Sequence, residues 1–397
     1  MSRTPSPFSP VTIGRWDLSN RLVMAPLTRN RAGEGQAPTR LHARYYGQRA
    51  SAGLIITEGS QPSAVGQGYL ATPGVHSEEQ AKGWRLVADA VHEGGGHVVV
   101  RLMHAGRVAH PDNKDGLETV APSAVRAPGE IVTADGSKPF AEPRALETDE
   151  LASVRDEFVA ASRLAVDAGL DGVELHAANG YLLHQFLAPS TNQRTDSYGG
   201  SPEARARFVV EVAQAVADEI GADRVGIRIS PGHPASGIEE PDAADLRATY
   251  TSLLEQLAPM DLAYLSILAF DAASMALTGE FAEIFGGPVL LNTGFSKITT
   301  YAEVEELLAG GVADAVVVGR PFLANPDLVR RWREHGDDAP QHPGPGHLLR
   351  RWRRGLHRLP DARGDRVAGG SHRLSGRRAW RRGRAGALPL RRRLTSW

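Results

Sequence analysis

The chain has 397 residues, 41% of them hydrophobic, and no cysteine. This length suits an α/β barrel with insertions or a two-domain protein, and the missing cysteine excludes disulfides, thiolate metal sites and cysteine nucleophiles. No apolar run approaches the roughly 18–20 residues of a membrane span, so we expect a cytoplasmic protein without a membrane partner.

Eight short apolar runs recur along the chain, and each predicts a strand that is buried on both faces. Helical patterns lie between them, and the pattern at 77–95 opens with a Ser-x-x-Gln capping box. This alternation predicts a (β/α)8 barrel over residues 1–335. A doubly wound sheet is the alternative, although no Gly-rich dinucleotide turn follows the first run. The eight runs are 21–27, 53–59, 97–106, 172–178, 224–230, 262–268, 288–294 and 314–320.

Two long insertions follow predicted strands. Residues 107–147 come after the third run, and residues 190–200 come shortly after the fourth. Both lie on the carboxyl side of a strand, where barrels place their active sites. Loops of such length are usually lids or binding loops, with ordinary surface excursions as the alternative.

Arg228 lies inside the apolar fifth run, in the segment GIRIS. A guanidinium in a buried strand must meet an anion or several acceptors, because an unpaired buried charge is very costly. Arg228 therefore indicates either a ligand site or an ion pair with a barrel carboxylate such as Glu174 or Glu58.

The ends of the last two runs indicate a phosphate site. Gly294 follows the seventh run, and Gly319 stands directly before Arg320 at the end of the eighth. Barrels often bind phosphate with these two loops, where glycine admits close approach and an Arg can hold two phosphate oxygens.

His176, Asn179 and Tyr181 follow the fourth run within six residues. An imidazole and an amide can both donate hydrogen bonds to one carbonyl oxygen, and a nearby phenol can donate a proton to carbon. We expect no metal here, since His176 lacks a second His or a carboxylate at ligand spacing. A serine triad is not expected either, because the sequence contains no Gly-x-Ser-x-Gly elbow.

Several segments together resemble the old yellow enzyme family of FMN-dependent ene-reductases, over residues 7 to 329. They are MAPLTRNRA, TEG, RLMHAGR, ELHAANGYLLHQFLAPSTNQRTDSYGGS, GIRISP and VGRPFLANPDL. The resemblance implies a barrel that holds FMN at its C-terminal mouth and takes hydride from NAD(P)H. It implies that the substrate is a small alkene activated by a carbonyl or nitro group.

The resemblance also implies a role for each matching residue. His176 and Asn179 would bind and polarise the substrate carbonyl, and Tyr181 would protonate the α-carbon. Arg228 would stabilise the negative charge of the reduced flavin. The other implied flavin contacts are Pro26, Leu27 and Thr28 along the ring, Gly59 at its O4 side, and Gly294, Phe295, Gly319 and Arg320 around the phosphate.

Two positions depart from the family pattern. Arg101 stands where the family has a Gln that would bind the flavin, and Arg is bulkier, permanently charged and unable to accept a hydrogen bond. We therefore expect Arg101 to alter flavin affinity or potential. Met103 stands where many members carry Trp, which predicts a wider substrate pocket.

The C-terminal segment differs in composition from the rest. Residues 341–397 hold 16 Arg, no Lys and two acidic residues, so their net charge is about +14 against about −15 for the body. A coding sequence for residues 346–360, shifted by one base, can read ATFYGGGAEGYTDYP, which matches the family's continuation. We infer a frame change between 333 and 338, and expect residues 336–397 to be a disordered, Arg-rich tail.

Two alternatives concern this tail. The polypeptide could be a flavin-binding but catalytically impaired relative, because the lost segment would supply a Tyr over the substrate pocket. A basic tail also suits nucleic acid, but its few aromatic residues disfavour that partner, and we expect none. The sequence does not indicate the physiological alkene, the choice between NADH and NADPH, or the oligomeric state.

Overall fold

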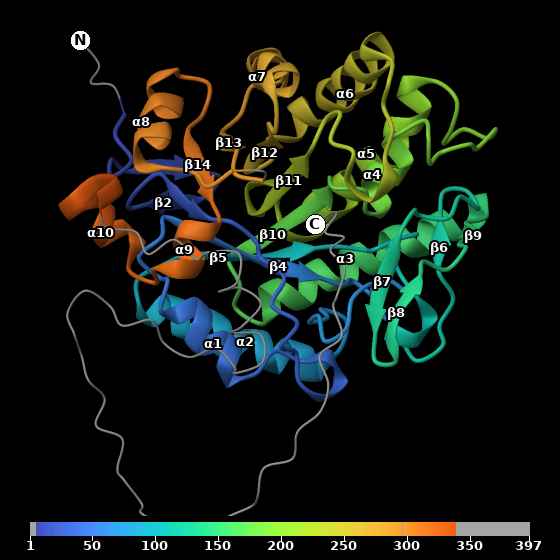
Figure 1. Ribbon diagram of the computed structural model, residues 1–397, viewed down its shortest axis with the longest axis horizontal. Helices are drawn as coiled ribbons and strands as arrows, with labels where there is room; N and C mark the ends of the chain where they lie inside the picture. Colours follow the sequence, from blue (N-terminus) through green and yellow to red (C-terminus); the bar gives the residue numbers. More distant parts are fainter. Residues whose placement is uncertain (1–4, 296, 339–397) are drawn as a thin grey trace, which may run out of the picture. The chain divides into compact units, whose positions relative to one another are not determined.

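The computed structural model describes residues 5–295 and 297–338, and its eight central parallel strands close into a barrel (Figure 1). The strands follow one another in chain order, and β14 closes the barrel against β3. The predicted (β/α)8 fold is confirmed, and every predicted run overlaps one barrel strand. The strands are β3 (Leu22–Met24), β4 (Leu54–Ser60), β5 (Val98–Leu102), β10 (Gly172–Ala177), β11 (Val225–Ile229), β12 (Tyr264–Leu268), β13 (Val289–Asn292) and β14 (Ala315–Val318).

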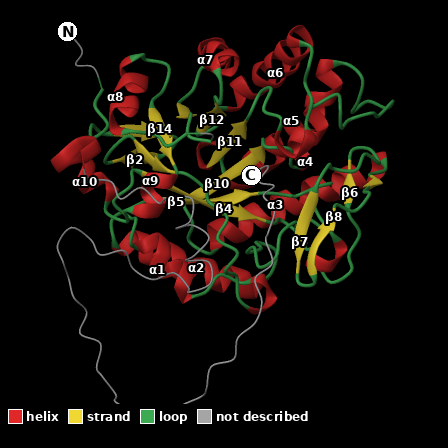
Figure 2. Cartoon of the chain, viewed as in Figure 1, coloured by secondary structure: helices red, strands yellow, loops and turns green. Residues whose placement is uncertain are grey.

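Helices surround the strands, as the red and yellow elements of Figure 2 show. Ser77 starts α2 by accepting a hydrogen bond from the Gln80 amide, but the Gln80 side chain accepts from His76. Only half of the predicted capping box therefore forms. The helices are α1 (Arg40–Gly47), α2 (Glu78–Glu93), α3 (Leu151–Asp167), α4 (Leu182–Leu187), α5 (Pro202–Ile220), α6 (Ala243–Leu257), α7 (Ala272–Phe285), α8 (Tyr301–Ala309), α9 (Arg320–Ala324) and α10 (Leu328–His335).

Side-chain alternation along the strands separates two environments. Outward residues such as Leu175 and Ile227 pack with the helices in the main core, while inward residues such as Val99 and Leu290 form a second apolar cluster. The hairpin of β1 (Val11–Ile13) and β2 (Trp16–Leu18) packs into this inner cluster. Because side chains alternate with a period of two, the next inward positions along the strands carry the polar groups of the site.

Gly226 shows how tightly the barrel interior is filled. A Cβ at this position would lie 2.1 Å from the ring of Tyr264 on the neighbouring strand. The missing side chain therefore makes room for the buried Tyr264 ring, whose hydroxyl donates to Glu174.

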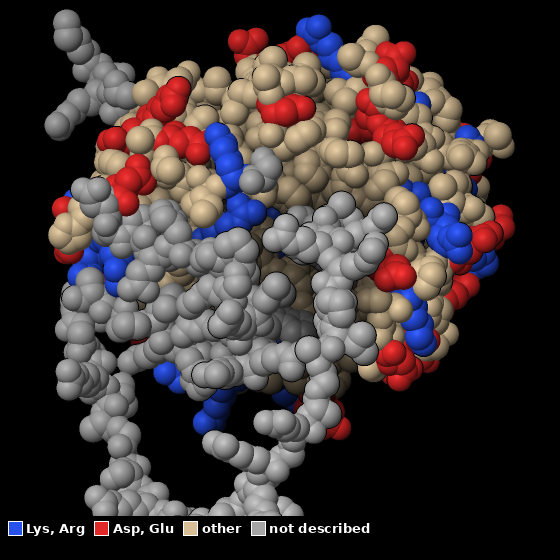
Figure 3. Space-filling view, in the orientation of Figure 1, with Lys and Arg blue, Asp and Glu red and all other residues tan. Residues whose placement is uncertain are grey.

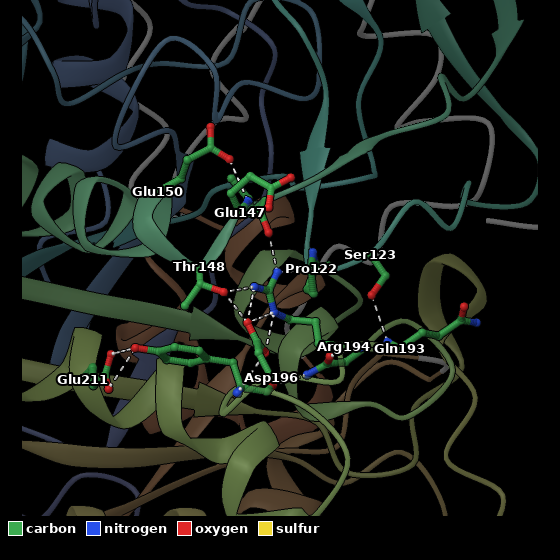
Figure 4. Close-up of polar contacts among 12 residues, drawn as sticks. Pro122, Ser123, Glu147, Thr148, Glu150, Gln193, Arg194, Asp196 and Glu211 are labelled. Carbon is green, nitrogen blue, oxygen red and sulfur yellow. Dashed lines mark hydrogen bonds and ion pairs between the residues drawn. The ribbon is translucent and has the colours of Figure 1, made fainter.

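The insertion after β5 carries four short strands: β6 (Val120–Ala121), β7 (Glu130–Thr133), β8 (Gly136–Pro139) and β9 (Arg144–Ala145). Arg194, from the other predicted insertion, donates to the Pro122 carbonyl at 3.1 Å and to the Thr148 hydroxyl at 3.2 Å, and it pairs with Asp196 (Figure 4). The two insertions thus form one connected structure beside the barrel.

Acidic side chains gather over α6 and α8 on the face that Figure 3 shows. This distribution agrees with the negative net charge predicted for the body. No helix in the two described ranges is long and apolar enough to cross a membrane. The chain's described part ends with the short helix η7 (Gly336–Asp338), which comprises the first three residues of the predicted tail. The rest of that tail, from 339 onward, lies outside the described residues.

Candidate active site at the C-terminal end of the barrel

Arg228 is buried in β11, and its guanidinium reaches neutral partners. One terminal nitrogen donates to the Asn292 side-chain oxygen at 3.0 Å, and the other donates to the Ser266 hydroxyl at 3.3 Å. The Nε atom is buried and has no hydrogen-bond partner among the described residues. Burial, followed by the charge of Arg101, lowers the pKa of Arg228 to about 9. Nε of Arg228 can thus donate to an acceptor that none of the described residues supplies.

The alternative ion pairs of Arg228 do not form. Glu174 pairs with Arg101, whose Nε lies 2.6 Å from Oε1 of Glu174. Glu58 instead accepts hydrogen bonds from the Arg29 amide and the Tyr46 hydroxyl. Of the two possibilities for Arg228, the ion pair with Glu174 or Glu58 is therefore not the one that forms, because other groups bind both acids.

A sharp turn after β10 orients the three predicted catalytic residues. Asn179 and Gly180 are both left-handed, with φ of 56° and 81°. The Asn179 amide donates to the Ser230 hydroxyl at 2.9 Å, and the Gly180 amide donates to Nδ1 of His184 at 3.0 Å. A left-handed Asn is uncommon and persists only where its surroundings hold it. The turn is thus built to present Asn179 and Tyr181.

His176 and Tyr181 lie side by side, with ring centroids 5.0 Å apart. The phenol oxygen of Tyr181 is 2.9 Å from that of Tyr69, which comes from the loop after β4. Burial raises the pKa of Tyr181, whereas its hydrogen bond with Tyr69 and the charge of Arg101 lower it. The sequence did not single out Tyr69, because a lone Tyr in a Gly-rich loop carries no local signal.

His176 and Asn179 both keep unused polar atoms. Nδ1 of His176 and Oδ1 of Asn179 are buried without a hydrogen-bond partner among the described residues. Burial, followed by the charges of Arg101 and Arg228, holds the pKa of His176 well below its ordinary value. The imidazole is therefore neutral near pH 7 and can donate one hydrogen bond without carrying a full charge.

Gly59 and Met103 are in direct contact. A Cβ at Gly59 would lie 2.5 Å from the sulfur of Met103, so a side chain at position 59 would displace Met103. The β4–β5 pairing also shifts register between Ile56 and Gly59. The protein's own packing thus explains this glycine, and its predicted flavin contact stays a prediction.

The predicted phosphate residues come together at the ends of β13 and β14. Arg320 donates to the carbonyls of Gly294 at 3.1 Å, Phe295 at 2.8 Å and Lys297 at 2.6 Å. Its guanidinium therefore fastens the loop after β13. At Gly319 an added Cβ would be 3.6 Å or more from its neighbours, Ala25 and Leu27.

The segment of Pro26, Leu27 and Thr28 lies beside the predicted phosphate residues, since Leu27 is a neighbour of Gly319. Pro26 and Leu27 are half-buried, and Thr28 is exposed. The next amide, that of Arg29, donates to the Glu58 carboxyl group at 2.7 Å. Burial raises the pKa of Glu58 to about 7. Glu58 thereby fixes the backbone directly after the residue predicted to contact the flavin.

His104 lies within the third predicted run and has a structural role. Its Nδ1 accepts a hydrogen bond from the Gly106 amide at 3.1 Å, and burial lowers its pKa to about 3. His104 therefore stays neutral and supports the turn after β5.

The residues present fit a flavin. The unpaired Nε of Arg228 can donate to a carbonyl or an anionic ring nitrogen, which the pyrimidine edge of FMN provides. The unpaired Nδ1 of His176 and the side-chain amide of Asn179, whose oxygen is an unpaired acceptor, provide a second polar region for a substrate. Fold and site together define a flavin-dependent barrel oxidoreductase.

Comparison with known proteins agrees with this class. The sequence model of the NADH:flavin oxidoreductase / NADH oxidase family matches residues 6–338. A probable flavin mononucleotide-dependent alkene reductase of Leishmania infantum is 40% identical over 332 residues, covering 82% of this chain and 89% of that protein. The chain belongs to the NADH:flavin oxidoreductase / NADH oxidase family.

Solved structures agree as well. Morphinone reductase superimposes with a TM-score of 0.81 at 40% identity, covering 87% of this chain and 93% of that one. The old yellow enzyme homologue from Zymomonas mobilis gives a TM-score of 0.80 at 38% identity, covering 86% and 96%. The predicted family and the prediction of an FMN-dependent oxidoreductase are confirmed, whereas the individual site roles stay predictions.

Proposed function

We propose that this protein uses FMN and NAD(P)H to reduce the carbon–carbon double bond of alkenes activated by a carbonyl or nitro group. The observation that carries the proposal is the turn after β10, which brings His176, Asn179 and Tyr181 together beside Arg228. Its similarity to an alkene reductase supports the same chemistry. Another structure of morphinone reductase contains tetrahydroNAD, which supports a nicotinamide as the hydride donor.

Each residue has a separate task in this proposal. Bound FMN would supply the hydride chemistry, with NAD(P)H as the source. His176 and Asn179 hold the substrate oxygen and favour the charge that develops on it, because preformed donors need no reorganisation during the reaction. The hydroxyl of Tyr181 gives its proton to the α-carbon.

Arg228 and the loops after β13 and β14 would bind the cofactor. Arg228 offers its free Nε to the flavin ring, and the loop fastened by Arg320 would lie at the phosphate. Pro26 to Thr28 would lie along the ring, held by the contact between Arg29 and Glu58.

The test combines a visible spectrum with an enone assay. The purified protein, loaded with FMN, should show a bound-flavin spectrum and should oxidise NADH or NADPH anaerobically when cyclohexenone is added. A protein that binds FMN and accepts hydride from neither nicotinamide would contradict the proposal. Arg205→Gln, which breaks the ion pair of the buried Arg205 on α5 with the half-buried Asp245 on α6, is the control for general instability.

A further inference from the structure

The structure contains a buried ion pair at the position where the family pattern expects Gln. Arg101 on β5 and Glu174 on β10 are register partners on neighbouring strands. Nε of Arg101 lies 2.6 Å from Oε1 of Glu174, and a terminal nitrogen contacts the same oxygen. Arg101 is 4% exposed and Glu174 is fully buried. The other oxygen of Glu174 accepts from Tyr264, so both carboxylate oxygens are engaged.

Arg228 stands one strand further and lacks such a partner. Its terminal nitrogens donate hydrogen bonds to the neutral groups of Ser266 and Asn292, and its Nε has no hydrogen-bond partner in the described ranges. Glu174 is still close enough to raise the pKa of Arg228. Glu174, the barrel carboxylate that raises the pKa of Arg228, is thus bound to a different arginine.

The residue at position 101 decides the net charge of this part of the barrel interior. Arg101, Glu174 and Arg228 together leave one net positive charge inside the barrel, whereas a Gln at 101 would leave none. A buried carboxylate that loses its cation must find another, because an uncompensated buried charge is strongly destabilising. Arg228 is the neighbouring cation, and it would then be neutralised.

We propose that Arg101 is a positioning residue that holds Glu174 away from Arg228 and so keeps the Arg228 charge available to the flavin. This inference rests on the proposed function, because it concerns the FMN that the site would hold. The flavin gains negative charge on reduction, and an unneutralised Arg228 favours that charge. Arg101 thereby raises the reduction potential of the bound flavin.

The test is a double-mutant cycle on the FMN-loaded protein. Midpoint potentials would be measured by anaerobic spectroelectrochemistry for wild type, Arg101→Gln, Glu174→Gln and the double variant. We expect Arg101→Gln to lower the potential in the wild-type background and to lower it less when Glu174 is already Gln. Such coupling is expected of residues that share one network.

The outcomes separate this inference from its rivals. Equal falls in both backgrounds would mean that Arg101 acts by its own charge, and no fall would mean that it has no influence; either result overturns the proposal.

Arg101→Lys, which keeps the charge and a donor, should retain most of the potential and covers the case in which the Gln variant fails to fold. Arg205→Gln should leave the potential unchanged, since its ion pair with Asp245 lies between outer helices. A wild-type protein that bound no FMN would instead reject the proposed function.

Discussion

The phenol oxygens of Tyr69 and Tyr181 lie 2.9 Å apart, and the two rings meet edge to face at 6.4 Å. When Tyr69 donates this hydrogen bond, the Tyr181 proton is free to point toward a substrate. The same bond stabilises the Tyr181 oxygen after the proton has left. Tyr69 is thus a positioning residue for the proposed proton donor.

Tyr181→Phe should slow alkene reduction by about 10²–10⁴-fold, the usual contribution of a positioned proton donor. Flavin reduction by NAD(P)H should stay near normal, because that half-reaction needs no proton from the phenol. Anaerobic stopped-flow absorbance can follow each half-reaction separately. Equal slowing of both halves would reject the role of Tyr181.

Tyr69→Phe should produce a smaller loss, of about tenfold, in alkene reduction. A single hydrogen bond typically contributes about 0.5–1.5 kcal/mol, and about 1.4 kcal/mol corresponds to tenfold in rate. Removing the bond also raises the pKa of Tyr181, since that bond lowers it. If Tyr69→Phe equalled Tyr181→Phe in effect, Tyr69 itself would be the proton donor.

His176→Ala and Asn179→Ala should each weaken the binding of a phenol, which as a phenolate imitates the polarised substrate oxygen. Titration of the oxidised FMN protein with para-chlorophenol, followed by visible absorbance, measures this. We expect about a tenfold or greater rise in dissociation constant for each, in line with one charge-assisted hydrogen bond. Tyr69→Phe is the matched control, and unchanged affinities in the Ala variants would remove both residues from the carbonyl site.

Glu58 should make stability depend on pH in an unusual direction. Burial raises the pKa of its carboxyl group to about 7 from 4.5, so the folded protein keeps the proton over a range where the unfolded chain has lost it. The extra proton binding of Glu58 in the folded state contributes fully to the free energy of unfolding below about pH 4.5. This contribution is lost as pH rises to about 7. The free energy of unfolding of wild type, minus that of Glu58→Gln, should fall across that window and be constant above it.

The comparison with Glu58→Gln also removes the contribution that the neighbouring His42 makes to the pH dependence of stability. His42 lies 3.8 Å from Glu58, and burial lowers the pKa of His42 to about 4. Both proteins contain His42, so its opposite pH dependence largely cancels in the difference. A difference that rose with pH, or stayed flat from pH 4 to 8, would show that folding does not raise the pKa of Glu58.

The inferred frame change predicts the outcome of two truncations. Asp337 accepts hydrogen bonds from the amides of Tyr301 at 2.6 Å and Ala302 at 3.1 Å, at the start of α8. Truncation after 338 should preserve thermal stability and enone turnover, whereas truncation after 335 removes this cap and should cost about 1 kcal/mol of stability. Loss of folding in the 338 truncation would make the tail a necessary element.

Restoring the alternative frame beyond residue 338 should raise thermal stability and enone turnover together. The family match ends at 338, next to the inferred frame change. Differential scanning fluorimetry and the enone assay compare the restored and present chains. Coding DNA from related strains that carried the present frame would contradict the inference.

The sequence alone determined the architecture, and it named the main candidate site residues, whose roles stay predictions. Eight apolar runs with helical patterns between them predicted the barrel, because strands buried on both faces leave a local signal. His176, Asn179 and Tyr181 were found because they stand within six residues in one motif.

Only the tertiary structure decided which group each polar side chain meets. Arg101 and Glu174 are 73 residues apart, and Tyr69 and Tyr181 are 112 apart, so no local pattern could pair them. Barrel register and loop packing set these contacts. From the sequence, Glu174 was a candidate partner for Arg228. In the structure the register of β5 against β10 places Arg101 directly opposite Glu174. The buried carboxylate pairs with this cation because it is the nearest one in register.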